Sequence, residues 1–385
     1  MRPNQRVSAL PLSTTLALDA RAKELAERGR DVINLSVGEP DFDSPAAVRA
    51  AAHGTIDGGR VRYTPAPGTK SLRRTVAAHL ARTRGVPFEL EQITVCHSAK
   101  HALSGALLSL LEPGDEVLLL LPAWVSYVEQ VRFAGGTPVA VRPRQDHGPD
   151  LDALRAAITP RTRGLMLNSP CNPSGYVLAP DETRAVAALA VERDLWILSD
   201  EIYSRLVFDG TTFSSPVQCG DEARARTVLV DGASKAFAMT GYRMGYLAAP
   251  ADVADAVGRL HSQLAGSPNA IGQEALEVAL RSEPPEVAEM AAEFERRRDL
   301  VVAGLRALGL ATPRPGGAFY AFPNVEPWLD GRGSDGFCAD LLESEGLALV
   351  PGTAFGLEGF VRLSYAASRG EIERGLERLG RFLDR

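Results

Sequence analysis

DGASKAFAMTGYRMGY, residues 231–246, contains Lys235, one of only four lysines in a chain that has 42 lysine and arginine residues together. Arginine fills the other cationic positions, but a guanidinium stays protonated and cannot act as a nucleophile. A lysine kept directly after the apolar run 227–230 is therefore a candidate for Schiff-base chemistry with an aldehyde. A solvated loop lysine is the alternative, and the rest of the chain has to decide between the two.

Short apolar runs alternate with helix-like stretches on either side of this segment. The clearest runs are residues 116–121, 164–167, 195–198 and 227–230. Residues 181–193 have an acidic first turn followed by alanine-rich helical periodicity, and another helix is predicted from about residue 98 to residue 111. This alternation predicts an α/β fold with a mostly parallel sheet. From about residue 286 a long charged helix and mixed α+β patterning predict a second, smaller domain, which the N-terminal stretch 33–41 is expected to join.

Composition excludes several classes of function. The chain has 385 residues, of which 45% are apolar and 23% charged, and its net charge is -6, which disfavours a nucleic-acid or anionic-membrane role. We find no signal peptide and no apolar run long enough to span a bilayer. Because the four cysteines form no C-x-x-C pair, we expect a reduced, cytoplasmic protein without disulfides or a cysteine zinc site. His97 and His101 are four residues apart, but two ligands make a weak case, so no metal site is predicted.

Polar residues follow three of the apolar runs. NSPCNPSG comes after residue 167, SDEIY after residue 198 and DGASK after residue 230. Ligands of parallel sheets bind beyond the carboxyl ends of the strands, so these segments predict one shared site. Asp200, 35 residues before Lys235, can keep a pyridine nitrogen protonated, and Tyr203 can hydrogen-bond a phenolate oxygen on the same ring.

A phosphate group would find donors in the same region. Ser98, Ala99 and Lys100 lie at a predicted helix start, where free N–H groups favour an anion. Ser234 and Arg243 flank Lys235 and can supply a hydroxyl and a guanidinium. Trp124 follows another strand end and can stack on a ring, although core packing explains it equally well. Neither a dinucleotide nor a nucleoside triphosphate motif is present.

With these residues in view, the chain resembles the class I aminotransferases of pyridoxal-phosphate fold type I, in particular the bacterial aspartate/prephenate subgroup. The resemblance runs nearly end to end and rests on eight segments in family order. They are NLSVGEPDFDSP, VRYTPAPGTKSLR, EPGDEVLLLLPAWVSY, NSPCNPSG, LSDEIY, SKAFAMTGYRMGY, PGGAFYAF and FVRLSYA.

The resemblance implies a large domain with a mostly parallel seven-stranded sheet flanked by helices, and a smaller α+β domain. Residues 1–44 would form an N-terminal arm and part of the small domain, residues 45–285 the large cofactor-binding domain and residues 286–385 the C-terminal small domain. The implied cofactor is pyridoxal 5'-phosphate, and the implied partners are an amino acid, a 2-oxo acid and a second copy of the chain.

The resemblance also implies roles at the cofactor. Lys235 would form the Schiff base and carry the proton, and Asp200 would pair with the pyridine nitrogen. Tyr203 and Asn172 would bond the phenolate oxygen, and Trp124 would stack on the ring. The phosphate would be held by Ser98, Ala99, Lys100, Ser234 and Arg243.

Three further roles concern the substrate and the subunit interface. Arg362 and Asn172 would clamp the substrate α-carboxylate, assisted by the backbone at Gly38. Arg362 lies in a short apolar run where an unpaired guanidinium is costly, although a structural ion pair would explain it too. Tyr63 would reach the phosphate of the neighbouring subunit, which implies a homodimer with composite sites.

Two positions depart from the pattern of the relatives. Gly232 stands where many relatives carry a hydroxyl residue, which puts one phosphate hydrogen bond in doubt. His97-Ser98 stands where relatives often have Asn-Gly, which can alter the phosphate turn.

We therefore predict a transaminase with ping-pong kinetics. A β-lyase, a cyclopropane-forming synthase or a decarboxylase of the same fold remains an alternative, because all share the lysine and aspartate. A ligand sensor fused to a DNA-binding module is disfavoured by the acidic charge. Lys100 and the hydroxyl residues 13–15 resemble positions that bind a side-chain carboxylate in the aspartate subgroup. Aspartate or glutamate is therefore the expected amino donor. Relatives in specialised metabolism can retain such residues while using other substrates, so the identity of the donor stays open.

Overall fold

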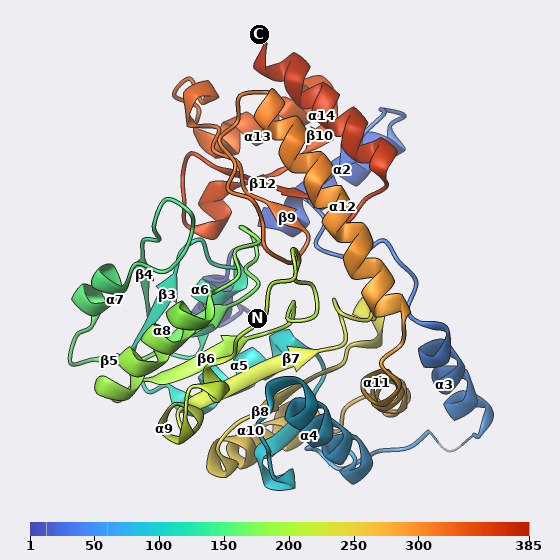
Figure 1. The fold of residues 1–385 in the computed structure, drawn as a ribbon, viewed down its shortest axis with the longest axis vertical. Coiled ribbons are helices and arrows are strands. Elements are labelled where there is room, and N and C mark those ends of the chain that lie inside the picture. The colour runs from blue at the N-terminus through green and yellow to red at the C-terminus, as the bar shows by residue number, and fades with distance from the viewer. Residues whose placement is uncertain (13, 60, 385) are drawn as a thin grey trace.

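The computed structural model describes residues 1–12, 14–59 and 61–384, and a seven-stranded sheet forms its centre (Figure 1). The strand order is β2-β8-β7-β6-β5-β3-β4. β8 runs antiparallel to both of its neighbours, and all other pairs are parallel. This arrangement confirms the predicted α/β fold. The strands are β2 (Ile93–Cys96), β3 (Glu116–Leu120), β4 (Thr137–Val141), β5 (Thr162–Asn168), β6 (Trp196–Asp200), β7 (Thr227–Gly232) and β8 (Gly245–Ala248).

The central strands are apolar over most of their length because helices cover both faces of the sheet. In β3, Leu118 packs into the cluster formed with α7 and α8, whereas its neighbour Leu119 packs on the opposite face with α5 and α6. The helices on these faces are α5 (Ala99–Leu110), α6 (Ser126–Phe133), α7 (Leu151–Ala157), α8 (Pro180–Glu192), α9 (Asp221–Arg224) and α10 (Ala251–Leu264).

A third cluster covers the edge of the sheet at β2. It contains Val95 of β2 and buried side chains of three helices. These helices are α3 (Ala46–Asp57), α4 (Lys70–Arg84) and α11 (Ala270–Ser282).

Two smaller sheets lie at one end of the large sheet, and the long helix α12 runs from the neighbourhood of α11 to reach them (Figure 1). β1 (Ile33–Asn34) pairs in parallel with β10 (Leu347–Ala348), so the early chain lies beside the C-terminal part. The second small sheet is antiparallel, with the order β11-β12-β9. The domain boundaries at residues 44 and 285 stay predictions. The remaining elements are β9 (Tyr320–Ala321), β11 (Val350–Pro351), β12 (Val361–Ser364), α1 (Gln5–Ser8), α2 (Thr14–Glu27), α12 (Glu286–Ala307), α13 (Gly333–Glu345), α14 (Arg369–Leu383) and the 3-10 turns at Leu90–Gln92, Pro216–Gln218, Thr240–Tyr242, Glu326–Trp328 and Gly352–Phe355.

The parallel strands place their polar carboxyl ends together. Asn168 at the end of β5 is the register partner of Asp200 at the end of β6, and β7 ends at Gly232, three residues before Lys235. The chemistry-bearing segments therefore meet at one edge of the sheet. No helix in the described ranges is long and apolar enough to cross a membrane.

Candidate active site

One pocket of about 370 Å³ gathers the predicted site residues at this edge. Segments that follow β3, β5, β6 and β7 line it together with the N-terminal stretch 36–39 and β12. All the predicted site residues except Tyr63 belong to its lining: Gly38, Ser98, Ala99, Lys100, Trp124, Asn172, Asp200, Tyr203, Ser234, Lys235, Arg243 and Arg362.

Lys235 presents its amine inside this pocket. Its Nζ donates a hydrogen bond of 2.5 Å to the carbonyl oxygen of Gly38. Burial lowers the pKa of the amine to about 8, the nearby Glu39 opposes that shift, and Arg362 adds to it. An amine with this pKa is partly neutral near physiological pH and can act as a nucleophile or accept a proton.

Asp200 is a buried carboxylate at the end of β6. The hydroxyl of Tyr127 donates to its Oδ2 over 2.7 Å, and the amide of Ile202 donates to Oδ1 over 3.2 Å. Burial raises the pKa of Asp200 to about 6, although the Tyr127 hydrogen bond favours the ionised form. Within the described residues Asp200 forms no ion pair, so a cationic group that enters the pocket, such as a protonated pyridine, suits it.

Arg362 is a second buried charge without a carboxylate partner among the described residues. Its Nη1 donates to Asn172 Oδ1 at 2.9 Å and its Nη2 to the carbonyl of Ser36 at 2.5 Å, while Nε is buried without a partner. The guanidinium lies 4.5 Å from the centroid of the Tyr320 ring. By contrast, the equally buried Arg84 is paired with Glu201 at 2.9 Å. Arg362 therefore fits a carboxylate supplied by a ligand better than a structural ion pair.

The pocket also offers donors to an anion. α5 begins here, and its N-cap Ser98 accepts a hydrogen bond from the amide of His101 at 3.2 Å. Arg243 adopts a left-handed backbone conformation with φ of 55°, and its Nη1 donates to the carbonyl of Thr240 at 2.6 Å. A helix start beside a hydroxyl and an arginine is suited to a phosphate.

The departure at Gly232 has a packing reason. A Cβ at this position would lie 2.8 Å from the carbonyl oxygen of Met244 and 2.9 Å from Cα of Gly245. Both neighbours are backbone atoms, one of the residue that precedes the adjacent strand β8 and one of its first residue, and they cannot give way easily. A hydroxyl side chain is therefore excluded at Gly232 unless the two strands move apart.

The described chain does not bring every predicted residue to the site. Tyr63 is 99% exposed and lies outside the pocket lining. Of the hydroxyl residues 13–15, Thr15 lines the pocket, Thr14 lines a neighbouring one, and residue 13 lies outside the described residues. Lys100 directs its Nζ to 4.7 Å from the centroid of the Trp124 ring, so these two side chains contact each other at the mouth.

Three residues that hold the site were missed in the sequence. Tyr127 binds Asp200, and the hydroxyl of Tyr320 lies 2.9 Å from that of Tyr203. Asn168 accepts from the amide of Asn172 at 2.7 Å and donates to the carbonyl of Asp200 at 3.1 Å, which fixes the loop after β5. All three lie within the quoted segments, but nothing in the sequence distinguishes them from packed side chains.

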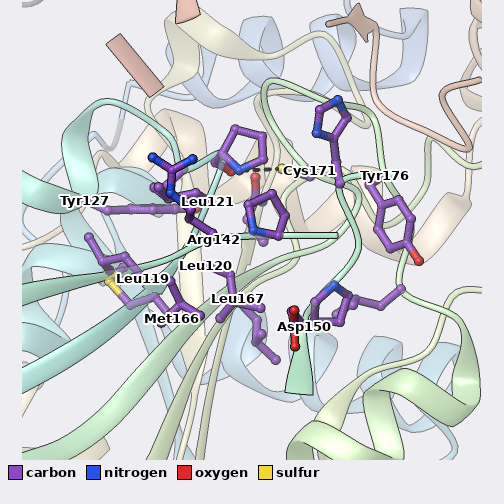
Figure 2. Close-up of a pocket in the computed structure, with 18 residues that line it drawn as sticks. Leu119, Leu120, Leu121, Tyr127, Arg142, Asp150, Met166, Leu167, Cys171 and Tyr176 are labelled. Carbon is purple, nitrogen blue, oxygen red and sulfur yellow. Dashed lines mark hydrogen bonds between the residues drawn. The ribbon is translucent and has the colours of Figure 1, made fainter. Parts of the chain in front are cut away.

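A separate cavity beside the pocket is too small to hold a cofactor. It measures about 40 Å³ and is lined by apolar side chains such as Leu119 and Met166 together with Arg142 and Cys171 (Figure 2). Such a volume has room for only a few water molecules. Tyr127 lines both this cavity and the larger pocket.

The fold and the larger pocket define a pyridoxal-phosphate enzyme of fold type I. A buried amine, a buried carboxylate without an ion-pair partner in the described chain, and an anion-binding helix start surround one space. These groups match the reactive carbon, the ring nitrogen and the phosphate of that cofactor.

The comparisons with known proteins agree with this class. The family model "Aminotransferase class I and II" matches residues 30–379, so the chain belongs to that family. It is a pyridoxal-phosphate-dependent aminotransferase, which confirms the prediction from the sequence.

The relatives match over their whole length. The aspartate/prephenate aminotransferase of Thermus thermophilus is 43% identical, with 99% of each chain covered, and the aspartate aminotransferase of Bacillus subtilis is 39% identical, with 100% of each covered. Among solved structures, the aspartate aminotransferase of Thermus thermophilus with maleate has a TM-score of 0.95 at 42% identity, covering 99% of this chain and 100% of that one.

Proposed function

We propose that this aminotransferase moves an amino group from an acidic L-amino acid, aspartate or glutamate, to a 2-oxo acid by a ping-pong mechanism. The observation that carries the choice of donor is the position of Lys100. The described pocket lining contains four cations, Lys100, Lys235, Arg243 and Arg362. Lys235 serves the chemistry, Arg243 suits the phosphate and Arg362 suits the α-carboxylate, which leaves the Lys100 ammonium for a carboxylate on the donor side chain.

The acidic groups around the pocket do not compete for that ammonium. Asp19 is paired with Lys23 at 2.7 Å, and Glu39 accepts a hydrogen bond from Thr240. Thr15 also lines the pocket and adds a further polar group. The names of the relatives also support an acidic donor, since the proteins compared above are called aspartate or aspartate/prephenate aminotransferases.

The mechanism assigns one task to each group of this chain. Pyridoxal phosphate, when bound, supplies an aldehyde for the amine and a ring that withdraws electrons from the substrate Cα. Lys235 Nζ would take the proton from the substrate Cα and deliver it to the cofactor carbon that carried the aldehyde. Asp200 holds a proton at the ring nitrogen, and Tyr127 keeps its carboxylate ionised and oriented.

The remaining residues bind and orient. Arg362 and Asn172 hold the α-carboxylate so that the Cα–H bond faces Lys235, with the backbone of Gly38 beside them. Tyr203 and Asn172 bind the phenolate oxygen, Trp124 stacks on the ring, and Ser98, Ala99, Ser234 and Arg243 hold the phosphate. Because the same groups serve donor and acceptor in turn, the two half-reactions share one site and follow ping-pong kinetics.

The proposed assembly is a homodimer in the cytoplasm. The exposed Tyr63 supports a second subunit, because its ring would otherwise be left almost wholly in water. In the dimer, Tyr63 of one subunit completes the phosphate site of the other.

Donor specificity tests the proposal. A panel of amino donors with 2-oxoglutarate, and of 2-oxo acids with aspartate, should give the highest kcat/KM for acidic substrates. A charged hydrogen bond contributes roughly 1.5–3 kcal/mol, so Lys100→Ala should lower kcat/KM for aspartate by about ten- to a hundred-fold. Alanine or phenylalanine should change much less. Lys70→Ala is the matched control, because Lys70 also lies at a helix start but outside the pocket.

Two results would contradict this assignment. An equal loss for acidic and neutral donors, together with weaker cofactor binding, would make Lys100 a phosphate ligand and leave the donor open. Steady turnover of an amino acid without any oxo-acid acceptor would favour a lyase or decarboxylase instead.

A further inference from the structure

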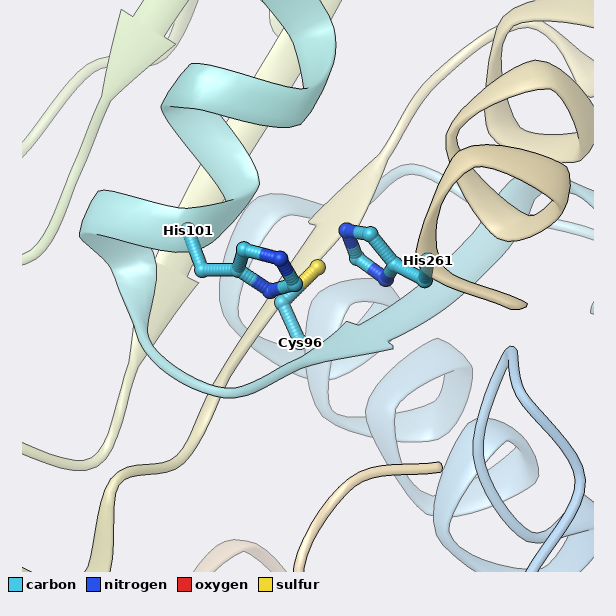
Figure 3. Close-up of side chains that lie close together, drawn as sticks. All are labelled: Cys96, His101 and His261. Atoms are coloured by element: carbon cyan, nitrogen blue, oxygen red, sulfur yellow. The ribbon is translucent and has the colours of Figure 1, made fainter. Parts of the chain in front are cut away.

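A cluster of three side chains that can bind a metal lies behind the start of α5, outside the groups used for transamination. Cys96 ends β2, His101 lies in the first turn of α5 and His261 lies in α10 (Figure 3). One donor atom of each residue lies within 4.8 Å of the donor atoms of the other two. The three side chains come from segments up to 165 residues apart and converge only in the fold.

The donor atoms of the cluster make few hydrogen bonds within the described chain, and His101 Nδ1 accepts one of 3.4 Å from the amide of His97. His261 is 1% exposed, and neither of its ring nitrogens has a hydrogen-bond partner in the described chain. Cys96 is a free, buried thiol whose contact with the carbonyl of Thr94 is 3.6 Å long. Buried polar nitrogens are normally satisfied, so an imidazole with two unsatisfied nitrogens calls for a ligand.

From this geometry we propose that Cys96, His101 and His261 bind a divalent cation of the zinc class. A thiolate and two imidazoles are a typical set of three protein ligands for Zn²⁺, with water in the fourth position. On binding, the Cys96 S–H bond breaks, its proton leaves to solvent and a sulfur–metal bond forms, while each histidine gives the lone pair of one ring nitrogen. No electrons are transferred in this step.

The histidines are ready to act as neutral ligands. Burial lowers the pKa of His261 to about 3, with His101 and His97 adding to the shift, and burial also lowers the pKa of His101. Their rings are stacked at a centroid distance of 4.1 Å, so one ring must turn before both lone pairs converge on a cation. His101 is only partly buried, so its ring is the one expected to turn.

A cation bound at this site would connect β2, α5 and α10 next to the cofactor pocket. The amide of His101 donates to Ser98 Oγ, and Ser98 lines the cofactor pocket. A cation bound to all three side chains therefore fixes the first turn of α5 to β2 and α10. His97 lies beside His101 with a ring-centroid distance of 5.1 Å, but it does not belong to the group of converging donor atoms, and water would take the fourth position.

Metal stoichiometry tests the inference on the whole enzyme. Untagged holoenzyme, freed of metal with a chelator and of unbound cofactor by gel filtration, should bind one Zn²⁺ per chain in calorimetry and retain it through a second gel filtration. Cys96→Ser and His101→Gln should each weaken binding more than about tenfold, since even the loss of an outer partner costs that much. Cys338→Ser, which alters a buried free cysteine elsewhere, is the control and should bind as the wild type does.

One spectroscopic and one thermal measurement distinguish a metal site from ordinary core packing. Co²⁺ should give ligand-field bands of a tetrahedral site at wavelengths beyond the cofactor's absorption, and Cys96→Ser should change them. Zn²⁺ should raise Tm of the wild type but not of either ligand variant. If Zn²⁺ does not bind, or binds equally well to both variants, the three side chains are packed neutral groups and the inference is wrong. Circular dichroism identifies a variant that fails to fold, and the other variant then decides.

Discussion

At the scale of single residues, the proposed mechanism depends on the environment of Asp200, which is expected to keep the cofactor ring able to accept electrons. The carboxylate is buried, and burial by itself favours its protonated form. The Tyr127 hydroxyl opposes this through a hydrogen bond of 2.7 Å. Tyr127 therefore matters to the reaction although it does not face the substrate in the proposed mechanism.

This pair leads to a prediction about two conservative changes. Asp200→Asn should bind the cofactor yet lose turnover by orders of magnitude, because an amide cannot hold the ring proton. Tyr127→Phe should lower kcat/KM by roughly ten- to a hundred-fold, as expected for a lost hydrogen bond to a charged group. Steady-state rates and cofactor absorption measure both effects.

The control for these variants is Tyr365→Phe. Tyr365 is also fully buried and its hydroxyl donates to a carbonyl, that of Ala318 at 3.4 Å, but it lies outside the pocket lining. It should lose stability without a comparable loss of rate. Full activity of Asp200→Asn would contradict the role of Asp200, and equal losses in both tyrosine variants would assign Tyr127 to stability alone.

At the scale of elements, the carboxylate of Glu293 helps to hold helix α12 against helix α14. Glu293 accepts hydrogen bonds from Arg296 at 2.9 Å, from Arg297 at 3.0 Å and from Arg369 of α14 at 2.7 Å. The hydrogen bond with Arg369 is the main cause of a pKa lowered to about 2. Because the folded pKa is below the ordinary value of 4.5, this carboxylate stabilises the fold above that value.

The sign of the shift sets the expected pH dependence. The contribution is complete above pH 4.5 and is lost as the pH falls toward 2. Glu293→Gln should lower Tm at pH 7, and the difference in Tm from the wild type should shrink from pH 4.5 downward. Glu289→Gln, on the exposed side of the same helix, is the control and should follow the wild type. A difference in Tm that stays constant down to pH 3 would contradict the prediction.

The sequence predicts those elements of the fold that have local signals and misses those that depend on distant pairing. The helix expected at residues 98–111 is observed as α5 at Ala99–Leu110, because the Ser98 cap and the Pro113-Gly114 turn are local signals. The two-residue strands β1 and β10 escaped prediction, since their pairing joins residue 33 to residue 347 and leaves no local pattern.

Residues with a local signal can be predicted, and residues that meet only through distant packing cannot, in the active site and in the proposed metal site alike. The sequence predicts Lys235 and Asp200, because each follows an apolar strand at a position that a ligand can reach. It does not predict that His261 lies against His101, because they are 160 residues apart and pair only through the packing of α10 on α5. Side chains that support a site through distant packing have no signature in a single sequence.

At the scale of the whole molecule, a single chain leaves several apolar side chains in water and leaves Tyr63 without the contact that is expected of it. Tyr63 is 99% exposed, and the nearby Val61 and Ile56 are 44% and 54% exposed. An aromatic ring and aliphatic neighbours in water are typical of an interface that a second subunit covers. If Tyr63 serves the phosphate of the partner, each active site contains residues of both chains.

Subunit mixing tests this composite site directly. Lys235→Ala should be inactive and Tyr63→Ala weakened. In a hybrid of the two, one site combines an intact Lys235 with an intact Tyr63 from the other chain, so co-expressed random pairing should restore roughly a quarter of all sites. A mixture of Lys235→Ala with the double variant Lys235→Ala/Tyr63→Ala has no intact lysine and should stay inactive. A mixture of the single variants that is no more active than its parts, or a fully active monomer in light scattering, would rule out the composite dimer, because each chain would then complete its own site.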